Sequence, residues 1–328
     1  MGNPVLEVTG LKTHFFTRSG VVKSVDGLSF SLQPGEILGL VGESGSGKSV
    51  TGFSILGLVD PPGRIVEGSI KLDGRELVGL DEASLQSVRG RELSMIFQDP
   101  MMTLNPVLRI GTQITETVLA HERVSAKAAR ARAVEALAMV GIPAPEERLD
   151  AYPHQFSGGM RQRVAIAIAL LHSPKVVIAD EPTTALDVTI QSQILAKVQE
   201  LCRETGTSLV WITHDLTVIA GLADRVAVMY AGRIVEEGSV DSVLDHPRHP
   251  YTQGLIGSVP STGARGTRLA QIPGSAPSLA NLPKGCAFAP RCSSVMDICH
   301  VAAPPLFTSE TTRAACFLVD PATAKNLT

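Results

Sequence analysis

The hydrophobic pattern predicts alternating strands and helices over most of the chain. From Val5 to about Gly238, short apolar runs rich in β-branched residues alternate with longer segments of helical periodicity. This alternation is typical of an α/β fold whose ligand site lies beyond the carboxyl ends of its strands. The clearest strands are expected at residues 37–41, 176–179, 209–212 and 226–229.

Two segments depart from this alternation. Strand signals vanish between residues 100 and 152, where Ser125 precedes apolar residues at helical spacing. Further along, the chain becomes rich in Pro, Gly, Ser and Thr and loses its periodicity. We therefore expect an α/β domain at residues 1–240 with a helical insertion at about 99–170, followed by a loop-rich C-terminal extension at 241–328.

Composition and charge are those of an ordinary globular chain. The 328 residues are 44% hydrophobic, 19% charged and 4% aromatic, which argues against a disordered or fibrous protein. With 29 basic and 32 acidic residues the net charge is −3, so no global field favours nucleic acid or an anionic lipid surface. Any phosphate ligand must therefore be held by a local site.

The sequence shows no membrane-spanning or targeting segment. No apolar run approaches the roughly 18–20 residues that a membrane-spanning helix needs. The N-terminal residues lack the basic and apolar regions of a signal peptide, and Leu6 stands where a myristoylation motif has Ser or Thr. We expect a cytosolic, unlipidated chain that does not cross a membrane by itself.

A phosphate-binding loop is predicted at residues 42–49, which read GESGSGKS and fit the pattern G-x-x-x-x-G-K-S/T. It follows an apolar strand pattern and precedes a helical one, which is the context that the motif requires. Its glycines let backbone N–H groups approach phosphate, Lys48 reaches the β- and γ-phosphates, and the Ser49 hydroxyl ligates Mg²⁺. The expected nucleotide contacts are Gly42, Glu43, Ser44, Gly45, Ser46, Gly47, Lys48, Ser49 and Val50.

Two adjacent carboxylates follow the predicted strand at 176–179. Neighbours in a strand point to opposite sides, so Asp180 is expected to hold Mg²⁺ while Glu181 faces a water in line with the γ-phosphate. The alternative for this pair is a solvated acidic turn at the end of a buried strand. The phosphate loop upstream argues against that alternative. The two motifs together predict a Mg-dependent nucleotide hydrolase.

Further motifs follow in a characteristic order. Gln98 comes after the strand-like SMIF, Ser157 opens SGGMRQR, Asp187 closes TALD and His214 follows LVWIT. With this order and spacing, the sequence resembles the ATP-binding-cassette ATPases. The resemblance implies a P-loop ATP-binding-cassette domain that binds ATP and Mg²⁺.

The resemblance also implies roles for individual residues. His214 is expected to contact the γ-phosphate and to position the attacking water with Glu181, and Gln98 to ligate Mg²⁺. Phe16, or Phe15, is expected to stack on adenine, with a core aromatic as the alternative. Because the usual LSGGQ reads FSGGM here, Met160 lacks the Gln side chain. The residues implied to bind a nucleotide held by a second ATPase subunit are Ser157, Gly158 and Gly159, and Asp187 is a further expected nucleotide-binding residue.

One branch of the family matches further. Residues 98–106 read QDPMMTLNP and resemble a stretch of the ATPases that power bacterial oligopeptide, dipeptide and nickel importers. The segments HPYTQGL, IPGSAPSL and GCAFAPRC resemble the C-terminal extension of the same branch. In such importers the first stretch receives a permease helix, so Met101, Met102 and Leu104 are expected docking residues, with buried filler as the alternative for the two methionines.

The implied function is that of an ATPase subunit at the cytoplasmic face of the cell membrane, energising import of dipeptides or oligopeptides. The implied partners are two transmembrane permease subunits, a second homologous ATPase subunit and an extracytoplasmic peptide-binding protein. Nickel or another small solute is the alternative cargo. A soluble cassette ATPase acting on nucleic acid or ribosomes is a further alternative. Such proteins usually have a second cassette, a coiled coil or a basic face, none of which is seen, so nucleic acid is not an expected partner.

Four of the five cysteines gather in the C-terminal extension: Cys286, Cys292, Cys299 and Cys316. Their spacings match neither typical structural zinc sites nor bacterial ferredoxins, so spacing alone selects no metal. A cytosolic setting disfavours disulfides, and loop-rich sequence offers little core to bury cysteines. Members of the peptide-importer branch with this quartet carry a 4Fe–4S cluster, which the resemblance implies here, with zinc as the alternative. Cys202, in a helical pattern, is expected only to be buried.

Overall fold

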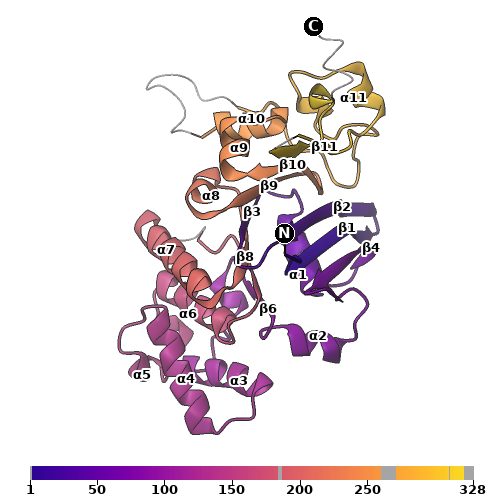
Figure 1. Cartoon of the computed structure of the whole chain (residues 1–328). Helices are drawn as coiled ribbons and strands as arrows, with labels where there is room; N and C mark the ends of the chain where they lie inside the picture. The colour runs from indigo at the N-terminus through magenta and orange to yellow at the C-terminus, as the bar shows by residue number, and fades with distance from the viewer. Residues whose placement is uncertain (1, 184–186, 260–270, 310, 321–328) are drawn as a thin grey trace. The chain divides into compact units, whose positions relative to one another are not determined.

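The computed structural model describes residues 2–183, 187–259, 271–309 and 311–320 (Figure 1). The chain divides into two compact units. These units follow spatial contacts and do not test the expected boundary at residue 240, which stays a prediction. Unit 1 comprises Met1–Leu6, Leu32–Glu36 and Asp73–Trp211, and unit 2 comprises Glu7–Ser31, Ile37–Leu72 and Ile212–Thr328.

Unit 1 is built on parallel strands covered by helices. β6 (Leu93–Ile96) and β7 (Val176–Asp180) pair in parallel, and all their residues are buried. β8 (Ser208–Thr213) lies beside β7 and continues into unit 2 after Trp211. The other elements are β5 (Arg75–Glu76), α2 (Glu82–Val88), η1 (Pro100–Met102), α3 (Ile110–His121), α4 (Ala126–Met139), α5 (Pro145–Arg148), η2 (Pro153–Gln155), α6 (Gly158–Leu170) and α7 (Val188–Thr205).

The expected helical insertion is present within unit 1, where α3, α4 and α5 lie together (Figure 1). Ser125 begins α4 as predicted, since its hydroxyl accepts the Ala128 N–H at 3.2 Å. Leu137 and Val140 are buried beneath this helix. The third residue of the periodic pattern, Val134, is only half-buried, and alanines form the rest of the buried face.

Unit 2 contains the remaining strands. β1 (Leu6–Thr17) lies between β2 (Gly20–Leu32) and β4 (Gly63–Leu72). β3 (Ile37–Val41) runs parallel to β9 (Arg225–Tyr230), which pairs antiparallel with β10 (Arg233–Ser239). The helices of unit 2 are α1 (Lys48–Ile55), α8 (Leu216–Leu222), α9 (Val240–Asp245), α10 (Pro250–Gly257) and α11 (Asp297–Val301).

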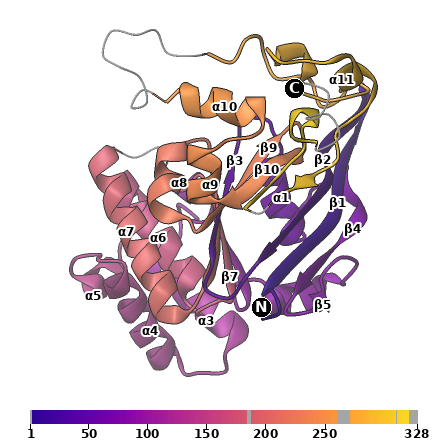
Figure 2. The ribbon, with the colours of Figure 1, turned by 45° about the horizontal axis from the view of Figure 1, so that its top comes forward.

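The C-terminal extension is part of unit 2. Its strand β12 (Thr312–Ala314) pairs antiparallel with β10, and β11 (Phe307–Thr308) pairs with β12. Figure 2 shows the helices α10 and α11 of the same extension. Most of the extension is otherwise loop and short helical turns, as its Pro-rich sequence predicts. The extension is thus joined to the α/β body by backbone hydrogen bonds.

The strands expected from the apolar runs are confirmed as β3, β7, β8 and β9. Among the described residues, no helix is both long and apolar enough to cross a membrane.

Candidate functional site

The phosphate loop at residues 42–49 links β3 to α1 in unit 2. Gly47 adopts a φ of +102°, and a Cβ atom there would lie 2.1 Å from the Ser24 carbonyl oxygen. A Cβ atom at Gly42 would lie 2.2 Å from the Met229 carbonyl oxygen. Only glycine fits at both positions, because the loop backbone passes so close to its neighbours.

Lys48 folds back across this loop. Its ammonium donates to the carbonyl oxygens of Gly42 at 2.8 Å and Glu43 at 3.0 Å, and the residue is buried. The N-cap residue of α1 is Gly47, which has no side chain to accept hydrogen bonds from the first N–H groups of the helix. Such a helix N-terminus, with a lysine beside it, has the chemistry of an anion site.

The acidic pair lies at the end of β7 in unit 1. Asp180 is the last residue of the strand and is buried. Glu181 lies one residue beyond, at a φ of +44°, so this left-handed turn sets its direction and strand alternation does not. Backbone strain of this kind costs about 1–3 kcal/mol and clusters at functional sites.

Gln98 lies beside Glu181 within unit 1. The Gln98 Nε2 atom donates to the Glu181 Oε2 atom at 3.5 Å. A cavity of about 170 Å³ adjoins Gln98 and the start of α6, and Gln162 Nε2, which lies on its wall, is buried without a partner among the described residues. The segment after β6 thus reaches both the acidic pair and the helix that Ser157 begins.

Ser157 begins α6 as its N-cap residue. Its hydroxyl accepts the Met160 N–H at 3.3 Å, while Ser157 and Gly158 are exposed. A Cβ atom at Gly159 would lie 2.7 Å from the side chain of Ile190, so the helix start packs closely on α7. The exposed N-terminus of α6 is therefore open to an anion that approaches from outside the chain.

Asp187 and His214 lie at element ends in their own units. Asp187 caps α7 by accepting the Ile190 N–H at 3.0 Å. Its motif companions Thr184, Ala185 and Leu186 lie outside the described residues. His214 follows β8 in unit 2 and is exposed. Both side chains are thus accessible near a helix start or a strand end.

Phe16 is not a core residue. It is 41% exposed, and the Arg64 guanidinium lies 4.4 Å from its ring centroid. The alternative interpretation as a core aromatic is therefore wrong, and one ring face is covered by Arg64.

The expected docking residues after Gln98 have different environments. Met102 is 71% exposed, but Leu104 is 1% exposed and packs in the interior of unit 1. Met101 is half-buried, with its sulfur 3.7 Å from an Arg161 guanidinium nitrogen. The expectation that Leu104 contacts a partner is wrong, because its apolar side chain is buried inside the chain.

Sequence reasoning missed a contact between the C-terminal extension and the phosphate loop. Arg291 donates to both carboxylate oxygens of Glu43, at 2.7 and 3.0 Å. The Glu43 N–H donates to the Tyr251 hydroxyl at 2.9 Å. The sequence signal for this contact was weak: Tyr251 lies in the segment HPYTQGL and Arg291 in GCAFAPRC, and neither segment had been given a role.

The four cysteines of the extension line one small cavity, together with Phe288 and Phe317. In the part of the chain that the structure describes, no three His, Cys, Asp or Glu side chains are grouped so that they could hold a metal ion. The structure therefore gives no support to the expected iron–sulfur cluster or zinc. Burial raises the pKa of Cys316 to about 11, and it also raises that of Cys286. Cys202 is buried in α7 as expected.

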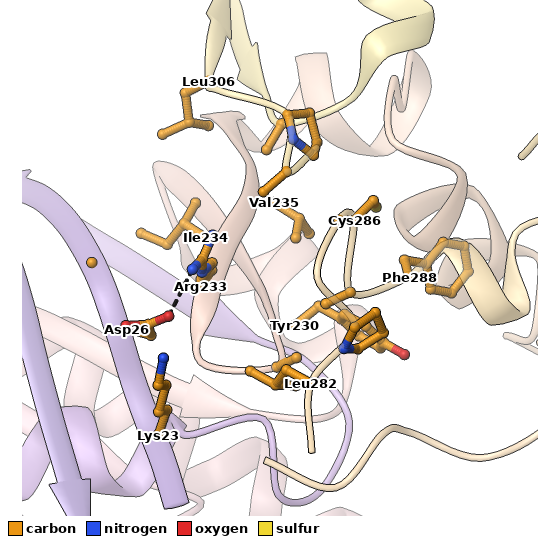
Figure 3. A pocket seen from close by; sticks show the side chains of 18 of the residues that line it. Lys23, Asp26, Tyr230, Arg233, Ile234, Val235, Leu282, Cys286, Phe288 and Leu306 are labelled. Carbon is orange, nitrogen blue, oxygen red and sulfur yellow. Dashed lines mark hydrogen bonds and ion pairs between the residues drawn. The ribbon is translucent and has the colours of Figure 1, made fainter. Parts of the chain in front are cut away.

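A wider pocket of about 730 Å³ lies in unit 2 against the extension (Figure 3). Asp26 and Arg233 form an ion pair of 2.6 Å on its wall, with the Lys23 side chain nearby (Figure 3). Lys12 and Lys284 also line it, so the lining is positively charged overall and favours an anion. No residue of the phosphate loop lines this pocket, which makes it a separate feature.

Family models match both parts of the chain. The ABC transporter model matches residues 25–184, and the model of the oligopeptide/dipeptide transporter C-terminal region matches residues 235–299.

Several curated proteins are similar over nearly the whole chain. The oligopeptide transport ATP-binding protein OppD of Bacillus subtilis is 53% identical over 97% of this chain and 89% of its own length. AppD of the same organism, which has the same description, is 51% identical over 96% of this chain and 97% of its own. OppD of Escherichia coli is 50% identical over 95% and 93%.

Solved structures of ATP-binding cassettes are similar in fold. The dimeric cassette MJ0796 in a post-hydrolysis state, bound to ADP and Pi, has a TM-score of 0.64 at 27% identity, covering 72% of this chain and 98% of that one. The protein cbiO1 from Clostridium perfringens, part of the ABC transporter complex cbiONQ, has a TM-score of 0.63 at 26% identity, covering 75% and 92%.

Proposed function

The chain belongs to the ABC transporter ATPases that carry the oligopeptide/dipeptide transporter C-terminal region, and we propose that it hydrolyses ATP to energise import of oligopeptides or dipeptides. The observation that carries this proposal is the phosphate loop crossed by Lys48, present in a chain whose relatives are oligopeptide transport ATP-binding proteins. The ATPase would act at the cytoplasmic face of the cell membrane, bound to permeases.

ATP binding would change the partners of Lys48. The Lys48 ammonium would exchange the carbonyl oxygens of Gly42 and Glu43 for phosphate oxygens, which form stronger charge-assisted hydrogen bonds. The loop and the start of α1 would then direct N–H groups at the phosphates, while Phe16 would offer adenine the ring face that Arg64 leaves uncovered.

We propose that Mg²⁺ is held by oxygen donors of this chain. Ser49, Gln98 and Asp180 supply hydroxyl, amide and carboxylate oxygens, which are the ligands that this hard cation prefers. When bound, the ion supplies charge neutralisation to the phosphates. Asp180 is suited to this role because it is a buried carboxylate at the end of a strand.

Hydrolysis needs a group that accepts the proton of the attacking water. We assign that role to Glu181, held within hydrogen-bond distance of Gln98 by a left-handed turn. His214 is assigned to position the water from its place after β8. General-base assistance of this kind contributes about 10²–10⁴-fold to a rate.

A second ATPase subunit would complete the site. Ser157 and Gly158 are exposed at the N-terminus of α6, where the hydroxyl and N–H groups can meet the γ-phosphate bound by another subunit. Asp187 would lie at the same interface. We propose a heterodimer, because the relevant branch usually pairs two homologous ATPases.

Permease docking would use the exposed apolar residues after Gln98. Met102 and Val107, which are 71% and 75% exposed, flank the buried Leu104. Two such side chains on a loop anchored by Leu104 suit an apolar helix of a permease subunit. An extracytoplasmic peptide-binding protein would deliver cargo to the same permeases.

The cysteine cavity is proposed to hold a 4Fe–4S cluster. Zinc needs four sulfurs about 3.8 Å apart, given its bond length and tetrahedral geometry, whereas an iron–sulfur cluster carries each thiolate on a separate iron. The support for this proposal is that the four cysteines line one cavity and that the sequence resembles members of the importer branch that carry such a cluster. Iron, sulfide and zinc analysis after anaerobic purification tests this, with each cysteine changed to Ser and Cys202→Ser as the control. Stoichiometric zinc without sulfide would overturn the cluster.

Transport is tested by uptake in cells whose only copy of the protein carries Glu181→Gln. Labelled di- to pentapeptides should cease to accumulate, while nickel uptake, measured in parallel, should be unchanged. Wild-type cells give the maximum peptide uptake, and cells without the protein give the background. Unchanged peptide uptake with loss of another solute would keep the ATPase assignment and overturn the cargo.

A further inference from the structure

We propose that the C-terminal extension positions the phosphate loop, through a clamp in which Arg291 and Tyr251 hold Glu43. The clamp deepens the proposed function and rests on it in one respect, since the loop must bind ATP for the clamp to matter. Arg291 and Tyr251 are positioning residues, because they act on nucleotide through Glu43 and the loop backbone.

The Arg291 contact is bidentate and largely shielded from water. Two parallel hydrogen bonds join its guanidinium to Glu43, and the Arg291 side chain is 6% exposed. The Arg291 Nε atom donates to the Pro273 carbonyl oxygen at 2.8 Å, which fixes the orientation of the guanidinium plane. The hydrogen bonds to the Glu43 carboxylate raise the pKa of Arg291, so its guanidinium stays charged. A planar fork of this kind specifies both the position and the direction of the carboxylate.

Tyr251 holds the backbone of the same residue. Its hydroxyl accepts the Glu43 N–H, and its ring is fully buried, with ring centroids 4.6 Å from Tyr230 and 5.5 Å from Phe288. Burial raises the pKa of Tyr251, so the phenol is neutral at physiological pH. Glu43 is thus held at its side chain and at its amide by two residues of the extension.

The HPY sequence explains why Tyr251 stands where it does. His249 is the N-cap of α10, and its Nδ1 atom accepts the Tyr251 N–H at 3.0 Å. Glu236 of β10 accepts the N–H groups of Arg248 at 2.6 Å and His249 at 3.0 Å. The motif therefore ties the start of α10 to β10 and aims the Tyr251 hydroxyl at the loop.

The clamp acts on the part of the loop where Lys48 rests. The Glu43 carbonyl oxygen is one of the two that accept from the Lys48 ammonium. Fixing Glu43 at three atoms therefore fixes the loop in a shape that Lys48 already crosses. Without the clamp the loop samples other shapes, and ATP must order it on binding, which weakens affinity.

The test compares two arginines of the same extension. Arg291→Met removes the clamp, whereas Arg313→Met removes an ion pair to Glu237 of β10 and leaves the loop untouched. We expect Arg291→Met to raise the ATP dissociation constant and KM about ten- to a hundredfold while kcat changes little. Arg313→Met should bind ATP as the wild type does, and Arg291→Lys should fall between, since lysine keeps the charge and loses the fork.

Tyr251→Phe supplies a second test that keeps the aromatic packing. It removes only the hydroxyl acceptor of the Glu43 N–H, so ATP affinity should fall a few-fold while the fold is kept. Binding is measured by equilibrium titration with a fluorescent ATP analogue and turnover by phosphate release. Circular dichroism verifies that each variant is folded. If Arg291→Met does not fold, the ATP affinity of Tyr251→Phe alone tests the clamp.

The outcomes separate this proposal from the proposed function. If the wild type itself binds no ATP, the proposed function fails. If the wild type binds ATP and both clamp variants bind it equally well, the clamp is refuted and the function stands. Equal weakening in Arg291→Met and Arg313→Met also refutes the clamp, because a general loosening of the extension would then explain the effect.

Discussion

The buried His249 predicts a pH-dependent stability that a single substitution removes. Burial lowers the pKa of His249 from 6.5 to about 4, so the folded chain keeps this imidazole neutral. The unfolded chain protonates it near pH 6.5, and the stability is therefore fully present above that pH and lost as the pH falls toward 4. The shift corresponds to about 3 kcal/mol in full, of which about 2 kcal/mol is lost by pH 5.

His249→Asn isolates this contribution. Asparagine does not titrate, and its side-chain oxygen can accept the Tyr251 N–H as the N-cap of α10. The variant loses the contact of the imidazole with Phe288 and is expected to be less stable at pH 7. Between pH 7 and pH 5, however, its free energy of unfolding should fall by about 2 kcal/mol less than that of the wild type.

Urea unfolding followed by circular dichroism, at half-unit steps from pH 5 to pH 7, measures both curves. Hydrogen exchange of the α10 amides gives a local readout of the same effect. Titrating groups distant from position 249 are present in both proteins, and their shared contribution cancels in the difference. Glu236, whose pKa burial raises, accepts the backbone N–H of residue 249, which the asparagine variant keeps. Parallel curves would refute the reasoning, since they would mean that His249 titrates alike in the folded and unfolded chains.

Three more substitutions test the assigned base, the phosphate loop and a helix cap. Glu181→Gln should lower ATP turnover by about 10²–10⁴-fold while ATP binding persists, as measured by phosphate release and by retained nucleotide; near-normal turnover would contradict the assigned base. Gly47→Ala places a methyl group against the Ser24 carbonyl oxygen and should abolish ATP binding in an equilibrium titration, so unchanged affinity would contradict the loop geometry. Ser125→Ala removes the cap of α4 and should cost about 1 kcal/mol in urea unfolding, and no loss would show that the cap is not stabilising.

Local pattern predicted the elements that local forces determine. The apolar runs gave β3 and β7, because buried strands need continuous apolar sequence. Ser125 and Ser157 were found at helix starts because their hydroxyls satisfy N–H groups within a few residues. The phosphate loop was found because its glycines meet steric demands that the motif itself encodes.

Features that depend on distant partners could not be predicted. Arg291 and Glu43 lie 248 positions apart, and no local pattern links a guanidinium to a carboxylate at that separation. Leu104 belongs to a loop-like segment, so only the packing of the folded chain shows that it is buried. The left-handed turn at Glu181 carries no glycine signal, because its surroundings impose a conformation that glutamate rarely adopts. The cysteine spacing alone did not show that the four side chains meet, and it was the resemblance to the importer branch that implied it; in the folded chain all four line one cavity.

Reconstitution shows whether this chain couples ATP hydrolysis to peptide import. The chain is combined in proteoliposomes with its permeases, its second ATPase and the peptide-binding protein, and ATP hydrolysis and peptide accumulation are followed together. We expect peptide on the binding-protein side to stimulate hydrolysis, accumulation to require ATP, and Glu181→Gln to abolish both. Hydrolysis indifferent to peptide, with no ATP-dependent accumulation, would contradict this coupling.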